Sequence, residues 1–102
     1  MTWKLFIDDE RNPITDDWVI VRSSSQAIKQ VVVRGMPIEI AFDHDLGGED
    51  TTMKFLSWLT DQLIMGSVEF PKNFKYSVHS MNPIGARNIA DRMNGLIEHF
   101  KK

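Results

Sequence analysis

Three short apolar segments of this sequence each lead directly into side chains that can do chemistry. The segments and the polar residues that follow them are residues 38–42 with Asp43-His44-Asp45, residues 5–7 with Asp8-Asp9-Glu10-Arg11, and residues 76–78 with His79-Ser80. Apolar runs of this length, bounded by acids and glycine, are typical of strands buried on both faces of a parallel sheet. In such sheets the working groups lie just past the carboxyl ends of the strands. We therefore expect these polar residues to meet at one edge of a sheet.

Carboxylates from two of these strand ends indicate a metal site. If the strands that end at Ile7 and Phe42 are neighbours, four carboxylates converge: Asp8, Asp9, Asp43 and Asp45. The first three are the predicted metal ligands. Two unit charges about 4 Å apart repel by roughly 4 kcal/mol at an effective dielectric constant near 20, so such a cluster needs a cation, a proton or an arginine. Carboxylate oxygens suit Mg²⁺ or Mn²⁺, and we predict one of these two ions as the cofactor. The alternative is that these acids are solvated loop residues.

Histidine is the side chain that exchanges protons near neutral pH, and two histidines follow predicted strands. We predict that His44 and His79 act as general acid and base, with Asp43 and Asp45 as catalytic carboxylates beside them. If the extended backbone continues past Phe42, Asp43 and Asp45 point to one side and His44 to the other. The competing interpretation is that each histidine is structural, which is the commoner role of an isolated histidine.

The segment after His79 predicts an anion site. Asn82-Pro83 is a strong helix start, because Asn caps free amides and Pro at the first helical position loses no hydrogen bond. A helix N-terminus at a strand end can bind a phosphate. The side chains that we predict to bind this phosphate are Arg11, Arg22, Ser80, Asn82, Arg87 and Asn88. Together with the acids and histidines they indicate phosphoryl or phosphodiester chemistry. The alternative is an ordinary helix cap with surface charge around it.

The rest of the sequence supplies a further strand and three helices. Residues 18–22 are β-branched and predict a strand. Three apolar stripes at helical spacing predict the helices: Ala27, Ile28, Val31 and Val32 before Gly35; Met53, Leu56, Leu59 and Leu63 before Gly66; and Ile89, Met93, Leu96, Ile97 and Phe100. Strands that alternate with helices predict a parallel sheet with right-handed crossovers.

One connection does not fit this pattern well. Residues 9–17 are fewer than the dozen or so that a parallel crossover normally needs. Either an abbreviated crossing joins the first two strands, or these two strands are antiparallel. We favour the abbreviated crossing.

The composition restricts the class of protein. At 102 residues, with no repeat or linker, the chain is expected to form one domain, residues 1–102. A net charge of −2 argues against general nucleic-acid binding, and the lack of cysteine excludes disulfides, thiolate catalysis and Cys-based zinc sites. We expect no signal peptide, because Met1 is followed directly by a predicted strand, and no apolar run approaches the roughly 20 residues that span a bilayer. We expect a cytoplasmic protein that does not bind membranes.

Four motifs carry a resemblance to known families: DDERNP at residues 8–13, WVIVRS at 18–23, FDHDLG at 42–47 and VHSMNPIGARNI at 78–89. The first resembles the start of response-regulator receiver domains, whose acidic pair holds Mg²⁺. Asp43 then lies where a receiver has its phosphoacceptor aspartate, and Ser80 lies near the receiver's switch residue. The whole set is more similar to the cyclic-phosphate-processing receiver-like domains of bacteria and phages. That group is inferred to process cyclic phosphates in nucleotides or at RNA ends.

The resemblance implies a fold as well as a function. We expect a small flavodoxin-like α/β three-layer sandwich, with a four-stranded, mainly parallel sheet in the order 2-1-3-4 and about three helices. A signalling receiver has a fifth strand, whose lysine contacts the phosphoryl group, and a fifth helix. The sequence ends after the helix that begins at Pro83, so both are expected to be missing. This difference, together with His44, His79 and Arg11, argues against an ordinary phosphorelay.

Three functions fit these residues. The first is a metal-assisted phosphohydrolase or phosphodiesterase whose substrate is a small nucleotide or an RNA-end phosphate. The second is a non-catalytic binding module, of phage origin, for a nucleotide or a host protein. The third is a receiver that is phosphorylated on Asp43.

Overall fold

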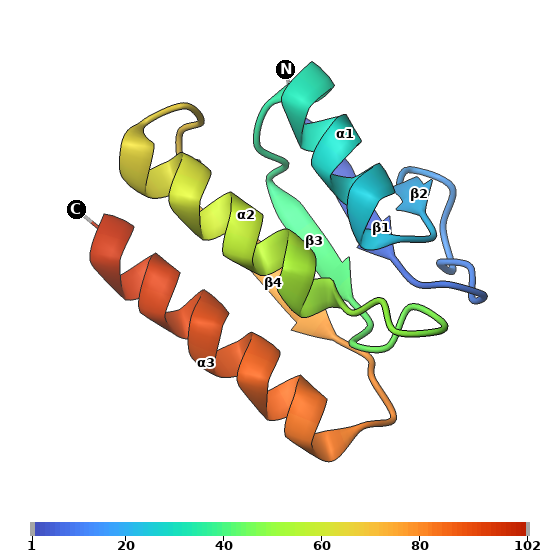
Figure 1. Cartoon of the computed structure of the whole chain (residues 1–102). Coiled ribbons are helices and arrows are strands. Elements are labelled where there is room, and N and C mark those ends of the chain that lie inside the picture. Colours follow the sequence, from blue (N-terminus) through green and yellow to red (C-terminus); the bar gives the residue numbers. More distant parts are fainter. Residues whose placement is uncertain (1, 102) are drawn as a thin grey trace.

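The computed structural model of the chain describes residues 2–101, which form four strands and three helices (Figure 1). In chain order they are β1 (Lys4–Ile7), β2 (Val19–Val21), α1 (Ser24–Arg34), β3 (Glu39–Phe42), α2 (Thr52–Met65), β4 (Lys75–Val78) and α3 (Pro83–Phe100). The order of elements is the predicted one. Within residues 2–101, no helix is long and apolar enough to cross a membrane.

The four strands form one parallel sheet in the order β2-β1-β3-β4, as predicted. β1 and β2 are parallel, with Leu5 opposite Val19, although the chain between them contains no helix. The prediction of an abbreviated crossing is therefore confirmed. Because the strands are parallel, the loops that follow β1, β3 and β4 all leave the sheet at its carboxyl edge (Figure 1).

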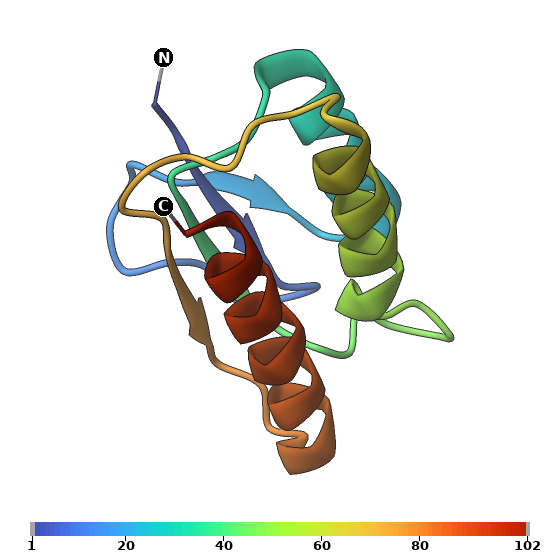
Figure 2. The same ribbon diagram turned by 90° about the vertical axis from the view of Figure 1, so that its left-hand side faces the viewer.

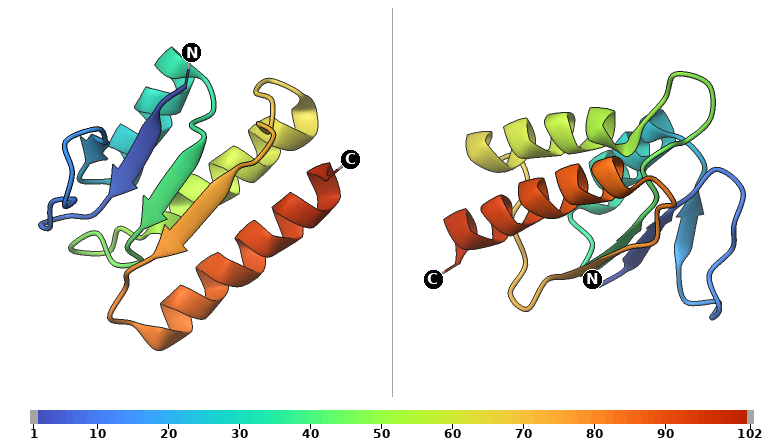
Figure 3. Two further views of the ribbon diagram at one scale, coloured as in Figure 1. Left: turned by 180° about the vertical axis from the view of Figure 1, so that it is seen from behind. Right: turned by 90° about the horizontal axis from the view of Figure 1, so that it is seen from below.

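All three helices lie on one face of the sheet, so the domain has two layers, and the predicted three-layer arrangement is corrected (Figures 2 and 3). The connections from β2 to β3 and from β3 to β4 move along the sheet in the same direction. Right-handed crossovers that move in one direction place their helices on the same face. The connection from β1 to β2 moves in the opposite direction but has no helix. The other face, seen in the left view of Figure 3, is therefore free of helices within residues 2–101.

The main core lies between the sheet and the helices. Alternate side chains of the two central strands are fully buried there: Leu5, Ile7, Ile40 and Phe42. They pack with apolar side chains from the three helices, including Val31, Leu56, Leu59, Ile89 and Met93. Phe6 and Ala41, which point to the helix-free face, are also buried, with 8% and 4% of their surface exposed. Burial on both faces explains why these strands are continuously apolar.

Side chains cap the N-termini of α1 and α3, and Asn82 is the cap predicted for α3, whereas Thr51 makes no side-chain cap hydrogen bond at the start of α2. Ser23 accepts a hydrogen bond from the amide of Gln26 (3.2 Å), and Asn82 accepts one from the amide of Gly85 (3.0 Å). These contacts satisfy backbone donors that have no partner inside the helix. They fix where α1 and α3 begin, directly after β2 and after the loop that follows β4.

One residue of the predicted apolar stripe of α1 is not in the core. Val32 is 68% exposed, whereas Val31 is buried. Neighbouring residues of a helix lie about 100° apart around its axis, so Val32 turns away from the sheet when Val31 faces it. The prediction for Val32 is therefore wrong.

Candidate active site at the carboxyl edge of the sheet

Asp8, Asp43 and His79 lie together because the sheet pairing continues for one residue beyond the strands. The amide of Asp43 donates to the carbonyl oxygen of Ile7 (2.9 Å), and the amide of His79 donates to that of Phe42 (2.8 Å). Each polar residue is thereby held level with the end of the neighbouring strand. The register of the sheet, more than any side-chain contact, sets the positions of these three residues.

The carboxylate of Asp8 is fully buried and well hydrogen-bonded. Its Oδ1 accepts from the amides of Glu10 (2.9 Å) and Arg11 (2.8 Å), and its Oδ2 lies 2.9 Å from Nε2 of His79. Burial raises the pKa of Asp8, but the two amides and His79 together bring this pKa below its ordinary value. Asp8 is therefore ionised at neutral pH.

His79 is held between Asp8 and an aromatic ring. Its imidazole stacks on Phe6, with the ring centroids 4.9 Å apart and the planes 10° from parallel. Because the ionised Asp8 oxygen accepts from Nε2, that nitrogen carries a hydrogen, and in the neutral imidazole the lone pair is then on Nδ1. The side chain is 24% exposed. His79 thus combines a fixed ring with a basic nitrogen at the surface of the site.

Asp8, Asp9 and Asp43 form an acidic cluster in which one oxygen of each carboxylate lies within 4.8 Å of the others. Burial and the negative charge of Asp8 raise the pKa of Asp43, while His79 and the His44 amide oppose this effect less strongly. The ionised form of Asp43 is therefore disfavoured by its surroundings. Three carboxylates offer hard oxygen donors that fit a divalent cation such as Mg²⁺ or Mn²⁺.

The loop after β3 closes on this cluster through a glycine turn. Gly47 and Gly48 both have positive φ angles, 94° and 59°. A Cβ atom on Gly47 would lie 3.4 Å from Oδ2 of Asp9. That distance is an ordinary van der Waals contact, so glycine is required at this position by the positive φ angle of the turn and not by the approach to Asp9.

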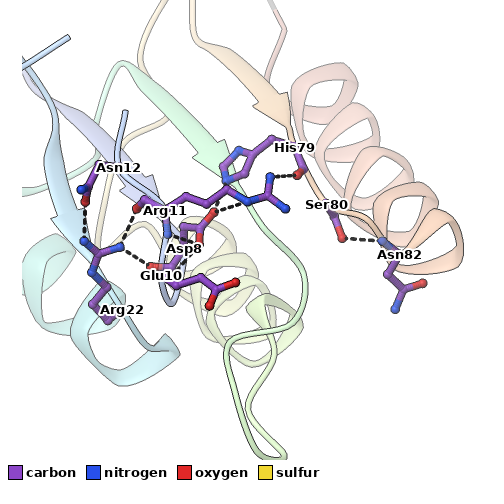
Figure 4. A network of polar contacts seen from close by, with 8 residues as sticks. All are labelled: Asp8, Glu10, Arg11, Asn12, Arg22, His79, Ser80 and Asn82. Carbon is purple, nitrogen blue, oxygen red and sulfur yellow. Dashed lines mark hydrogen bonds and ion pairs between the residues drawn. The ribbon is translucent and has the colours of Figure 1, made fainter. Parts of the chain in front are cut away.

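Arg11 places a positive charge beside Asp8 (Figure 4). Its Nη1 donates to the carbonyl oxygen of His79 (3.1 Å), and its Nε lies 3.9 Å from Oδ2 of Asp8. The side chain is 46% exposed, so the guanidinium borders on solvent. This is a suitable position for a group that binds a phosphate oxygen.

Arg22 supports the loop that carries these residues (Figure 4). Its Nη1 donates to the carbonyl oxygens of Asp8 (3.1 Å) and Arg11 (2.5 Å), and its Nη2 donates to Oδ1 of Asn12 (2.6 Å). We predicted Arg22 as a phosphate-binding residue. The structure directs its guanidinium to the 8–12 loop, where it acts as a positioning residue.

His44 and Asp45 form a second pair, next to the start of α3. Nδ1 of His44 lies 3.0 Å from Oδ1 of Asp45, and Oδ2 of Asp45 accepts from Nδ2 of Asn82 (3.3 Å). Within residues 2–101, no hydrogen bond or ion pair connects these three side chains to the acidic cluster or to His79. The predicted catalytic residues thus fall into two groups.

The prediction that Asp43 and Asp45 point to the same side is wrong. Asp43 faces Asp8 and Asp9, whereas Asp45 faces His44 and Asn82. The strict alternation of side chains ends with β3 at Phe42. Beyond it the chain turns at once, because Asp45 pairs with Thr51 and the amide of Thr52 bonds to the carbonyl oxygen of His44.

A comparison with protein families identifies the domain. The model of the cyclic-phosphate processing receiver domain matches residues 3–95, which include both groups of side chains. The chain belongs to this family. No curated protein and no solved structure matches the chain significantly. Membership confirms the resemblance carried by the four motifs and agrees with the parallel 2-1-3-4 sheet.

In this cyclic-phosphate processing receiver domain, the other predicted phosphate-binding residues belong to the start of α3. Oγ of Ser80 accepts from the amide of Asn82 (3.1 Å), and Asn82 caps the amide of Gly85. Arg87 and Asn88 are exposed on α3. Within residues 2–101, no hydrogen bond or ion pair links Arg87 or Asn88 to the acidic cluster.

The roles of two residues of the site were not indicated by the sequence reasoning. Phe6, which supports His79, looks like any other apolar residue of a strand, and no sequence signal distinguishes it. Gly85 leaves room for the ring of His44: a Cβ atom there would lie 2.4 Å from Cγ of His44. A signal for Gly85 did exist, because a glycine inside a helix is unfavourable unless close packing requires it.

Proposed function

We propose that this domain is a phosphodiesterase that hydrolyses a cyclic phosphate, either in a small nucleotide or at an RNA end. The observation that carries the proposal is the pairing of Asp8 with His79. It puts an imidazole with a free basic nitrogen beside three carboxylates and an arginine. The name of the family, which refers to cyclic-phosphate processing, supports the same chemistry.

His79 serves as the general base. Its Nδ1 accepts a proton from the attacking water, and the ionised Asp8 at Nε2 stabilises the imidazolium that forms. The stack on Phe6 keeps the ring in one orientation while the proton moves. A positioned base of this kind typically contributes about 10²- to 10⁴-fold to the rate.

The phosphate is held by positive charge at the same edge of the sheet. Arg11 binds one of its oxygens through the N–H groups that it does not use on His79. Asp8, Asp9 and Asp43 would hold a divalent cation, since Oδ2 of Asp8 still has a lone pair beside its contact with His79. When bound, such a cation neutralises phosphate charge and lowers the pKa of a coordinated water.

The reaction forms one bond and breaks another. The water oxygen bonds to phosphorus, and one P–O bond of the ring breaks. His79 takes one proton from the water, and the departing oxygen gains one proton in return. The other hydrogen of the water stays on the oxygen that is now bound to phosphorus. The products are a phosphate monoester and a free hydroxyl on the same molecule.

His44 and Asp45 take a smaller part in this proposal. They lie at the start of α3 and share no hydrogen bond with His79. We expect His44→Ala to lower turnover by less than about tenfold, which is below the range of a general base. A loss as large as that of His79→Ala would make His44 the general acid of the reaction.

The test is hydrolysis of a panel of 2′,3′-cyclic and 3′,5′-cyclic nucleotides and linear phosphodiesters, each with Mg²⁺ or Mn²⁺. His79→Ala and Asp8→Asn are expected to lower turnover by about 10²- to 10⁴-fold. His99→Ala is the matched control, because His99 is an exposed histidine near the C-terminal end of α3. It is expected to leave turnover unchanged.

Three results would contradict the proposal. If no metal supports turnover of any substrate, the domain is not a phosphodiesterase. If nucleotides bind without product formation, the domain is a binding module. If acetyl phosphate labels the protein and Asp43→Asn removes the label, Asp43 is a phosphoacceptor and the receiver function is correct.

A further inference from the structure

The helix-free face of the sheet has an apolar surface of its own. The register of the strands places Ile20, Phe6, Ala41 and Ser77 in one row across this face. Phe6 and Ala41 are almost fully buried, but they are not part of the main core. The ring of Trp18 packs edge-on against Phe6, with the centroids 5.8 Å apart. Aromatic side chains and the 11–15 loop thus stand over a floor formed by the sheet.

A groove of about 460 Å³ lies on this face. Phe6, Ala41 and Ser77 line its floor, and Trp18 and the 11–15 loop line its sides. Sites for small molecules typically measure about 300–1,000 Å³ and are mostly apolar with a few polar groups. The groove has the size and the composition of such a site.

The groove is continuous with the candidate active site. Arg11 and His79 line one part of it, and the same two side chains contact Asp8 at the carboxyl edge. No acidic residue lines the groove. A ligand that matches this surface has a flat, mostly apolar part and an anionic group attached to it.

We propose that this groove binds the base of a nucleotide whose cyclic phosphate lies at Arg11 and His79. This inference rests on the proposed function and adds that the domain recognises the base of its substrate as well as the phosphate. Aromatic side chains bind bases of any sequence by stacking, and Trp18 lines this groove. Oδ1 of Asn12 accepts from Arg22, so its N–H groups remain as donors to the edge of a base.

A second hollow of about 550 Å³ lies on the same loop and is lined by residues 12–16 and Ile20. It is lined by neither Arg11 nor His79. A base bound there would have no contact with the side chains that hold the phosphate. We therefore place the base in the groove beside Trp18.

The experiment is a titration of the ¹⁵N-labelled domain, followed through the amide signals of Trp18, Ala41 and Ser77. The ligands are 2′,3′-cyclic AMP in EDTA, adenosine, and the base-free ribose 5-phosphate. Cyclic AMP is expected to shift all three signals and to bind at least about tenfold more tightly than ribose 5-phosphate. Adenosine is expected to shift the same signals at higher concentration.

Two variants test the groove without changing the acidic cluster. Trp18→Ala removes the stacking surface, and Ser77→Leu fills the floor. Each is expected to weaken cyclic AMP binding about tenfold and to leave ribose 5-phosphate binding unchanged. Ser57→Leu, the same exchange at an exposed position of α2, is the control and is expected to have no effect. Melting temperatures of all variants verify that they are folded.

The results separate this inference from the proposed function. If cyclic phosphates are hydrolysed but base-containing and base-free ligands bind equally, the groove does not bind the base. If adenosine shifts the groove signals but nothing is hydrolysed, the groove binds a base and the proposed function fails. If no nucleoside or nucleotide shifts the signals, and the domain forms a dimer that Ser77→Leu disrupts, a second copy covers this face and the inference is wrong.

Discussion

Asp8 is the residue on which the candidate site depends. A buried carboxylate is costly unless its oxygens are hydrogen-bonded. Here two amides and one imidazole meet that requirement, and Arg11 adds a positive charge nearby. One side chain therefore determines the conformation of the 8–11 loop and the orientation of His79. A substitution of Asp8 affects both.

The ionised carboxylate of Asp43 is less well stabilised than that of Asp8, and this difference leads to a prediction about stability. Because burial and the charge of Asp8 raise the pKa of Asp43, its ionised form lowers the free energy of unfolding at neutral pH. We expect Asp43→Asn to raise that free energy by on the order of 1 kcal/mol in EDTA. The same variant is expected to lose any stabilisation by Mn²⁺. Urea unfolding with and without MnCl₂ measures both effects.

Asp45→Asn is the control for this prediction. Hydrogen bonds from His44 and Asn82 lower the pKa of the exposed Asp45, so its replacement brings no gain in stability. The difference in the free energy of unfolding between Asp43→Asn and the wild type should also shrink as the pH falls through the raised pKa of Asp43. Wild-type Asp43 then becomes neutral, as the asparagine already is. Equal stabilities of the two variants at neutral pH would mean that Asp43 is not under electrostatic strain.

At the scale of elements, the start of α3 and the loop after β3 depend on each other. His44 packs against Gly85, where a Cβ atom would lie 2.4 Å from the imidazole. Gly95, in the same helix, has no atom within 4 Å of the corresponding position. The two glycines therefore form a matched pair for mutation.

We expect Gly85→Ala and Gly95→Ala to have opposite effects. Alanine is the better helix former, so Gly95→Ala should raise the free energy of unfolding by about 1 kcal/mol. Gly85→Ala should lower it by about 1–3 kcal/mol, because the imidazole must move. Urea unfolding measures the two changes, and the ring-proton signals of His44 report its displacement. If both variants are equally stabilised and these signals do not move, His44 does not pack on α3.

At the scale of the whole molecule, several carboxylates make the fold sensitive to acid. Thr15 and Lys4 lower the pKa of Asp17 to about 2. Burial raises the pKa of Asp50, but its hydrogen bonds with Ser24 at the start of α1 lower this pKa overall. A group with a lowered pKa stabilises the fold above its unfolded pKa, and this stabilisation is lost as the pH falls through the folded value.

We therefore expect the melting temperature to fall between about pH 4 and pH 2. Asp50→Asn should reduce this fall in melting temperature more than Asp17→Asn does. Asp50 is partly buried and accepts two hydrogen bonds from Ser24. The Lys4–Asp17 ion pair is exposed to solvent and contributes little to stability. Thermal unfolding of both variants from pH 7 to pH 2 tests this order. A larger effect of Asp17→Asn would show that the surface pair contributes more than the buried contact.

The placement of the helices gives the domain two different faces. The helix-covered face contains the main core, and the helix-free face carries the groove that leads to His79. Both result from one feature, the connection between β1 and β2 without a helix. A helix on that face would stand over Phe6 and Ala41. Its absence from residues 2–101 makes the groove accessible to a ligand.

The sequence by itself determined the order of elements, the parallel sheet and the cap of α3. These depend on local patterns: apolar runs, turn glycines, and capping residues such as Asn82. It also determined that Asp8, Asp43 and His79 lie at the carboxyl edge, because each directly follows an apolar strand. Family membership, too, followed from motifs that can be read along the chain.

The tertiary structure alone decided how these side chains are grouped. Asp45 was expected beside Asp43, but the turn after Phe42 directs it to His44 and Asn82. Arg22 was predicted to bind a phosphate, and the folded chain shows that its guanidinium donates hydrogen bonds to the 8–12 loop. Side-chain directions beyond a strand end depend on contacts between residues far apart in the sequence, so no local pattern specifies them. For the same reason, only the folded chain shows that Phe6 supports His79 and lines a groove on the helix-free face.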